Sequence, residues 1–136
     1  MRPFRDDSGK VALFTVIVAN FWVFMLGLVV VGGGRMRAYQ RADNIAAEAA
    51  RAAGSAIEAG QAVQGGEKVV DPVKAQQAAS SYITAAGATG KVAVADDRTH
   101  LIVTVYLEYT NPSGLAFLGG ATWTATGVAN ATLLVG

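Results

Sequence analysis

The sequence has no cysteine, a single histidine and few charged residues. The absence of cysteine excludes disulfides, thiol catalysis and thiolate metal sites, and it leaves the redox compartment undecided. His100 alone cannot build a metal site from several imidazoles, and we expect it on the solvated face of a strand. Charged residues make up 15% of the chain, against about 25% in soluble domains. The sequence therefore excludes metal centres built on thiolates or on several imidazoles.

Charge patterning also excludes several classes of partner. The net charge of +1 provides no basic surface of the kind that binds nucleic acid. No nucleophile, base and acid stand at a readable spacing, and Asp96-Asp97 is more typical of a tight turn than of a cation site. We therefore expect a protein that is not an enzyme and that has no cofactor, no small-molecule substrate and no nucleic-acid partner.

What the sequence does have is a long apolar run from Val11 to Val31, with no charge and only two polar residues, Thr15 and Asn20. A helix of this length spans about 31 Å, close to the ~30 Å hydrocarbon core of a bilayer. Cleavable signal peptides have apolar regions of only about 7–15 residues, and a buried core helix would show a polar stripe. We expect residues 11–34 to form a retained transmembrane anchor. The alternatives are a soluble core helix or a signal peptide cut near Gly32, which would release a soluble secreted domain.

Flanking charges leave the orientation of this anchor undecided, because three basic residues precede the run and three follow it. Residues 1–10 are too short for a domain, whereas the tail is rich in strand patterns. We therefore expect a single-pass protein of the cell membrane with a cytoplasmic head (1–10) and an extracytoplasmic C-terminal domain. Gly32–Gly34, at the membrane exit, weaken a helix by about 1 kcal/mol each and predict a bend or a close backbone contact.

Residues 35–64 are rich in alanine and favour a helical stalk. Small apolar residues recur there at alternating spacings of four and three, which is typical of a helix that packs against other helices. This alanine seam comprises Ala38, Ala42, Ile45, Ala49, Ala52, Ala56, Ala59 and Val63. Within the anchor, the Asn20 amide would gain from a partner on another helix. The residues that we expect to pack against a partner helix are Asn20, Ala42, Ile45, Ala49, Ala52 and Ala56.

Residues 65–136 predict a small exported α/β domain. Asp71-Pro72 reads as an N-cap and first helical position, and Gly87 ends the short helix that follows. Strand patterns follow at 91–95, 99–110 and 122–135, and the middle one alternates apolar and polar residues. The predicted class is α+β. A long N-terminal helix, with a transmembrane half and an alanine-rich extension, precedes one short helix packed on a small three-stranded antiparallel sheet.

The connection between the last two predicted strands is apolar, although connections are usually polar. Its large side chains are Leu115, Phe117 and Leu118. Either they tuck into the small core, or they face a partner or the membrane surface. The second interpretation allows another function, that of a single-pass, membrane-tethered binding module that holds another envelope protein through its exported sheet and this apolar loop.

Several stretches together resemble TadE/TadG-like pilus-assembly proteins, especially the short actinobacterial kind. They are DDSGKVALF, GLVVVGGGR and RADNIAAEAARAAG, followed by the tail DPVKAQQAASSYITAAGATGKVAV. The resemblance implies a membrane-anchored, pilin-like structural or assembly subunit of a tight-adherence (Flp-type IV) pilus or a related envelope secretion apparatus. Its partners would be membrane lipid, other pilin-like or envelope proteins, and further copies of itself.

The same resemblance implies a prepilin cleavage site between Gly9 and Lys10. Type IV pilin-like proteins are cut after a glycine, and their mature helix commonly carries glutamate at its fifth residue. In this chain the fifth residue after such a cut is Phe14, which departs from the pattern. TadG-like members also lack the glutamate, so cleavage at this position stays an open expectation.

Overall fold

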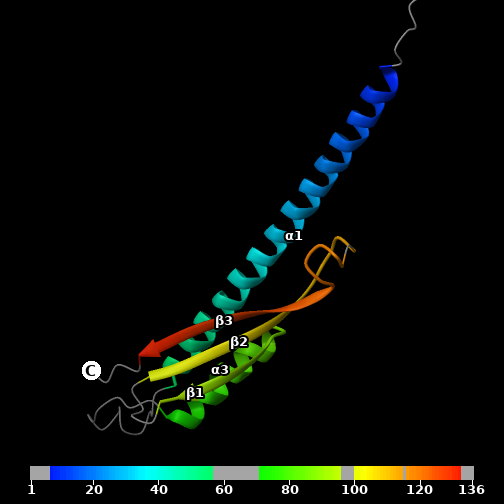
Figure 1. Ribbon diagram of the computed structural model, residues 1–136. Coiled ribbons are helices and arrows are strands. Elements are labelled where there is room, and N and C mark those ends of the chain that lie inside the picture. Colours follow the sequence, from blue (N-terminus) through cyan, green and yellow to red (C-terminus); the bar gives the residue numbers. More distant parts are fainter. Residues whose placement is uncertain (1–6, 57–70, 96–99, 115, 133–136) are drawn as a thin grey trace, which may run out of the picture. The chain divides into compact units, whose positions relative to one another are not determined.

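The computed structural model describes residues 7–56, 71–95, 100–114 and 116–132. Its elements, in chain order, are α1 (Ser8–Gly54), α3 (Pro72–Ala85), β1 (Thr89–Val94), β2 (His100–Thr110) and β3 (Thr122–Thr132) (Figure 1). The chain divides into two compact units, one of Met1–Gly34 with Asn111–Ala121 and one of Arg35–Thr110 with Thr122–Gly136. The predicted α+β class, with one long helix, one short helix and a three-stranded antiparallel sheet, is confirmed.

Helix α1 is uninterrupted over its 47 residues and includes Gly32–Gly34. The predicted close backbone contact is absent at two of these glycines. Among the described residues, nothing beyond α1 itself comes within 4 Å of a methyl group placed on Gly32 or Gly33. Runs of helix formers on both sides carry the helix through the three glycines, although each is a poor helix former.

Helix α1 ends at Gly54, so residues 35–54 of the stalk predicted over 35–64 are helical. The Ser55 hydroxyl donates to the Ala52 carbonyl at 2.7 Å, and the Ala56 N–H donates to the Ala53 carbonyl at 3.1 Å. These bonds satisfy carbonyls of the last turn, where glycine disfavours a further turn. Residues 57–64 of the predicted stalk lie outside the described residues.

The sheet is a simple meander in which β2 is central and antiparallel to both neighbours. Val103 of β2 stands opposite Val92 of β1 and Ala129 of β3, so these three side chains point to the same face. On that face Leu101, Val103 and Val105 are fully buried, as the alternation in the sequence predicts. The opposite face of β3 is exposed and rich in threonine.

The second half of α1 and helix α3 both cover the buried face of the sheet. Their buried residues form one cluster with Leu101, Val103 and Val105 of β2. The residues from α1 are Ile45, Ala46, Ala49, Ala50 and Ala53, and those from α3 are Ala75, Ala79 and Ile83. Most of these helical side chains are alanine. A thin core of small side chains therefore holds this unit together.

Helix α3 begins and ends as the sequence predicts. The Asp71 carboxylate accepts hydrogen bonds from the N–H groups of Val73 and Lys74 at 2.9 and 3.3 Å, and Pro72 occupies the first helical position. At the other end Gly87 adopts a positive φ of 72°, and the Ala88 N–H donates to the Ile83 carbonyl at 3.1 Å. These caps fix α3 against β1.

Candidate functional site

The first half of α1 carries a large apolar surface that the described chain leaves exposed. α1 is the one helix among the described residues that is long and apolar enough to cross a membrane. An 18-residue window within it has a mean hydropathy of 2.4, and only 6% of that window is buried. Exposed side chains occur all around the helix, for example at Phe21, Trp22 and Val23. A surface of this kind needs lipid or other protein to cover it.

The polar residues of the apolar run are satisfied within the helix itself. The Asn20 Nδ2 group donates to the Val16 carbonyl at 2.8 Å, and the Thr15 hydroxyl donates to the Val11 carbonyl at 2.8 Å. Bonds of this kind return a donor to the preceding turn and lower the cost of a polar side chain in lipid. Asn20 is exposed, so its amide also faces any neighbour of α1.

Most of the alanine seam lies against the chain's own sheet. Ala42, Ile45 and Ala49 are buried, and Ala52 and Ala56 are partly buried. The closest approach is at Gly127 of β3, where an added methyl group would overlap the backbone carbonyl of Ala42. This part of α1 is therefore covered by the sheet, whereas the half that contains Asn20 is mostly exposed. Ala59 and Val63 lie outside the described residues.

The connection between β2 and β3, residues 111–121, is organised around the buried side chain of Asn111. Its Nδ2 group donates to the carbonyls of Leu118 and Gly120 at 3.2 and 3.1 Å. Its Oδ1 atom accepts from the Ser113 N–H at 3.0 Å and from the Ser113 hydroxyl at 2.7 Å. The Asn111 backbone N–H donates to Ala121 at 2.9 Å, which closes the loop at its base. One amide side chain thus holds both ends of the β2–β3 loop.

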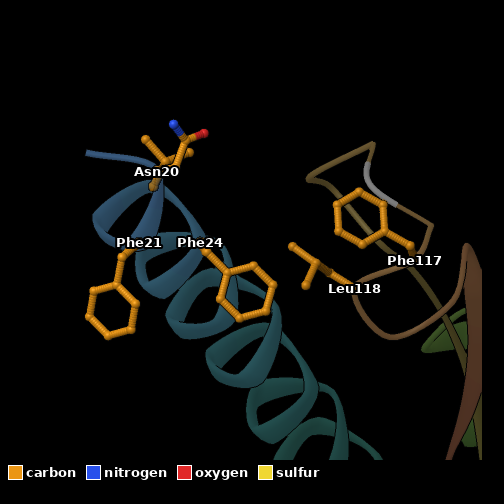
Figure 2. Close-up of a pocket in the computed structure, with 6 residues that line it drawn as sticks. Asn20, Phe21, Phe24, Phe117 and Leu118 are labelled. Carbon is orange, nitrogen blue, oxygen red and sulfur yellow. The ribbon is translucent and has the colours of Figure 1, made fainter. Parts of the chain in front are cut away.

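The β2–β3 loop lies against the first half of α1 and forms an open apolar groove with it. Leu118 is 8% exposed, and its Cδ1 atom lies 3.1 Å from the position of a methyl group added to Gly27. Figure 2 shows Leu118 and Phe24 pointing toward one another, with Phe117 beside them. The groove has a volume of about 430 Å³, and its lining residues are Asn20, Phe21, Val23, Phe24, Phe117 and Leu118.

The loop was expected either to tuck into the core or to face a partner or the membrane, and two of its residues differ in this respect. Leu118 is buried, but it packs on the apolar half of α1 and belongs to neither cluster of the core. Phe117 is 76% exposed. Leu115 lies outside the described residues.

An aromatic cluster with one cation lies within the second unit. The Trp123 ring lies 5.1 Å from the Tyr39 ring and 5.4 Å from the Tyr109 ring, both measured between centroids. The Arg35 guanidinium lies 5.0 Å from the centroid of the Trp123 ring, in cation–π geometry. Arg35 is also the first charged residue after the apolar run. Tryptophan, tyrosine and arginine are the residues that favour a membrane–water interface.

The proposed cleavage position lies in the first turn of α1. Gly9 and Lys10 are exposed and helical, and the Lys10 ammonium forms an ion pair of 3.1 Å with Asp7. The Val11 N–H donates to the Asp7 carbonyl at 3.1 Å, so the helical bonding already includes this position. A peptidase would have to unwind this turn to reach the bond between Gly9 and Lys10.

Within the part of the chain that the structure describes, no three histidine, cysteine, aspartate or glutamate residues gather where they could hold a metal. His100 is exposed on β2, and Asp96-Asp97 lies outside the described residues. A second groove, between α3 and β1, carries the hydroxyls of Ser80, Thr84 and Thr89. Two of them already donate to backbone carbonyls, Thr84 to Ser80 at 2.9 Å and Thr89 to Tyr106 at 3.4 Å.

The pKa of the Asp71 carboxyl lies below its ordinary value, chiefly because the Lys74 N–H donates to it. The Val73 N–H and the Lys74 ammonium, which lies 3.5 Å away, lower it further. These are the interactions of a helix cap, and Asp71 lines neither groove. The shifted pKa therefore reflects capping and not acid–base chemistry.

The sequence patterns do not single out two residues that organise these features, Asn111 and Trp123. Asn-Pro-Ser-Gly is a favourable pattern for an asparagine that bonds the backbone two residues on. The signal for Trp123 is the combination with Arg35 and Tyr39, which requires knowing that β3 packs against α1.

Comparisons with protein-family models, with curated proteins and with solved structures find no match to this chain. The case for a function is therefore built from the residues and their geometry. Three features carry it: the exposed apolar half of α1, the β2–β3 loop that packs on it, and the aromatic cluster at Arg35.

Proposed function

We propose that the protein is a membrane-anchored, pilin-like structural subunit that assembles through α1 in a pilus or a related secretion apparatus of the cell envelope. The observation that carries this proposal is the difference in burial between the two halves of α1. One side of the second half is buried on the chain's own sheet, and the first half leaves most of its apolar side chains exposed. Such a surface suits a helix that crosses a membrane and packs beside like helices.

The packing surface proposed here lies on the first half of α1, whereas the sequence pattern predicted it mainly along the alanine seam. Ala42, Ile45 and Ala49 are buried within the chain, so a partner helix has no access to them while the domain is folded. Of the other predicted packing residues, Ala52 and Ala56 are partly buried and Asn20 is exposed, so we place the packing surface at Asn20 and its exposed neighbours. In this arrangement van der Waals packing between apolar helices drives assembly, and the Asn20 amide adds at most about 1–2 kcal/mol.

The resemblance to TadE/TadG-like proteins supports the specific form of the proposal, a subunit of a tight-adherence pilus. The alanine-rich motif of the resemblance falls within α1, and its tail motif covers α3 and β1. In this proposal α1 supplies residues both to the anchor and to the domain that carries the sheet. Localisation in the cell membrane, with the sheet outside the cytoplasm, follows from the same proposal.

The intact mass of the protein, taken from its native membrane, tests the fate of the anchor. A full-length mass means a retained anchor, and the loss of residues 1–9 means prepilin cleavage between Gly9 and Lys10. The loss of about the first 32 residues would identify a signal peptide, and it would refute the anchor and the assembly role together.

Single-cysteine cross-linking tests assembly through α1, because the native chain has no cysteine to interfere. Cysteines are placed one at a time at positions 16 to 24, in native membranes, and oxidised to disulfides. We expect cross-links between chains to peak with a period of about 3.6 residues, since only one helix face meets the neighbour. A cysteine at Thr126, exposed on β3, is the control. Uniform or absent cross-linking along α1 would refute packing through this helix.

The alternative function is a membrane-tethered module that binds another envelope protein through its sheet. The observation that favours it is a pair of apolar side chains on the exposed face of the sheet. Ile102 and Val128 lie there with 43% and 55% of their surface exposed. Under this alternative, substituting both by threonine would abolish binding to the partner while the α1 cross-links stayed unchanged. Under the assembly proposal the same double variant keeps its cross-linking pattern and its function.

A further inference from the structure

We propose that the β2–β3 loop is a second membrane-contacting element, in which Phe117 inserts among phospholipid acyl chains beside α1 and Leu118 fastens the loop to the helix. The inference rests on the proposed function in one respect, that α1 crosses a membrane. It goes further by committing the apolar loop to lipid and not to an envelope protein.

The first argument is depth along α1. Leu118 packs at Gly27, which precedes Arg35, the first charged residue after the run, by eight positions. At 1.5 Å per residue this places the contact about 12 Å along the helix on the apolar side of that charge. Phe24, which also lines the groove, lies about 16 Å on the same side. If α1 spans a bilayer, a side chain that touches Gly27 or Phe24 is therefore at the depth of hydrocarbon.

The second argument is the chemistry of the loop. Residues 111–121 read NPSGLAFLGGA and contain no charged residue. Phe117 is the most exposed large apolar side chain that the structure describes. In water this exposure has a free-energy cost, whereas burying a phenylalanine side chain in an apolar medium stabilises it. The loop is therefore built for an apolar surrounding.

The third argument is the polar backbone of the loop, which any segment in lipid must satisfy internally. Asn111 supplies two donors to the carbonyls of Leu118 and Gly120, and its Oδ1 atom accepts from Ser113. The Gly120 N–H donates to the Ala116 carbonyl at 2.8 Å. Gly119 and Gly120 both adopt positive φ, which lets this tight turn form without side-chain strain. The polar groups point inward while Phe117 points outward.

The fourth argument is the aromatic cluster around Trp123. Tyr109 and Trp123 are the aromatic residues that flank the loop in the sequence, and both pack in the cluster that contains Tyr39 and Arg35. Rings with polar edges beside a cation are typical of the headgroup level of a membrane. In the sequence, the uncharged loop is thus flanked on both sides by residues that are typical of the membrane–water interface.

Fluorescence quenching on the full chain, reconstituted in phosphatidylcholine vesicles, tests the inference. Three single-cysteine variants each carry an environment-sensitive dye: Phe117→Cys in the loop, Val23→Cys in the apolar run and Thr126→Cys on the exposed sheet face. Val23 and Phe117 are both highly exposed, so neither substitution removes core packing, and unchanged tryptophan emission verifies the fold. Lipids brominated on their acyl chains report contact with hydrocarbon, and iodide reports contact with water.

The expected result is a blue-shifted dye at position 117 that brominated lipid quenches and iodide does not, as at position 23. The dye at Thr126 should show the reverse. A dye at position 117 that iodide quenches would overturn the inference, because the loop would then be in water. A dye that neither agent quenches would also overturn it, because protein would then cover Phe117. If the dye at Val23 is quenched by iodide, α1 does not span the membrane, and the proposed function fails separately.

Discussion

The close approach of α1 to β3 gives the sharpest prediction, which concerns Gly127. An added methyl group at this glycine would overlap the backbone carbonyl of Ala42. Backbone atoms cannot rotate away as a flexible side chain can, so α1 and β3 would have to separate. We expect Gly127→Ala to destabilise the sheet-containing unit, although alanine is ordinarily the better strand residue.

The magnitude follows from two opposing terms. Overpacking a well-packed core costs about 1–3 kcal/mol. The smaller conformational freedom of alanine in the unfolded chain offsets about 0.4–1 kcal/mol of this cost. The net loss is therefore about 1–2 kcal/mol, and separation of α1 from β3 would also expose Ala42 and Ala125, both buried now. Gly33→Ala is the matched control, because its added methyl group meets nothing described within 4 Å. It should raise helix stability by about 0.5–1 kcal/mol.

The assay is urea unfolding in detergent, followed by the fluorescence of Trp123 in a Trp22→Phe background. The chain has two tryptophans, so this background leaves only the one that packs on Tyr39 and Tyr109. With a slope of about 1–3 kcal/mol per molar urea, Gly127→Ala should lower the midpoint by about 0.5–1 M. An unchanged or higher midpoint for Gly127→Ala would refute the backbone contact between α1 and β3.

Three further predictions concern single side chains. Asn111→Asp should destabilise the β2–β3 loop by about 1–3 kcal/mol, since a carboxylate cannot donate to the Leu118 and Gly120 carbonyls. Hydrogen exchange of the loop amides measures this, and equal protection in the variant would contradict it. Tyr109→Phe should leave stability unchanged or raise it by up to about 1 kcal/mol, because the buried Tyr109 hydroxyl has no hydrogen-bond partner among the described residues. A clear loss in urea unfolding would reveal a partner outside them. Asp71→Asn should reduce the acid sensitivity of folding. The pKa of Asp71 is lowered in the folded chain, so its contribution is present above the ordinary value of 3.8 and is lost as the pH falls through the folded value. Thermal unfolding between pH 5 and pH 2 measures the difference, and parallel curves for the two proteins would contradict it.

Local signals in the sequence predicted the elements of this fold well. Asp71-Pro72 and Gly87 marked the two ends of α3, because capping depends on residues next to one another. The alternation of apolar residues in 99–110 gave the buried face of β2, since side chains of a strand alternate between two faces. The uncharged run from Val11 gave the exposed half of α1. Each of these signals needs no knowledge of what the element packs against.

Partners between elements were not predictable in the same way. The alanine seam indicated that a close neighbour covers Ala42 and Ala49, but small side chains fit a second helix and a sheet equally well. What selects the sheet is Gly127, which lies 85 positions after Ala42 and leaves room for the helix backbone. A glycine within a strand signals a close backbone approach without naming the partner.

The β2–β3 loop shows how this limit affects the function. Its apolar sequence predicts that Phe117 and Leu118 are covered. The core of the domain, a partner protein and lipid could each provide that cover. The contact of Leu118 with Gly27 excludes the core of the sheet as the cover of this loop, because Gly27 belongs to the uncharged run. The surface that covers Phe117 is then whatever surrounds the first half of α1. If the first half of α1 is in lipid, Phe117 is therefore in lipid as well. Quenching at position 23 reports the surroundings of α1, and quenching at position 117 reports those of the loop.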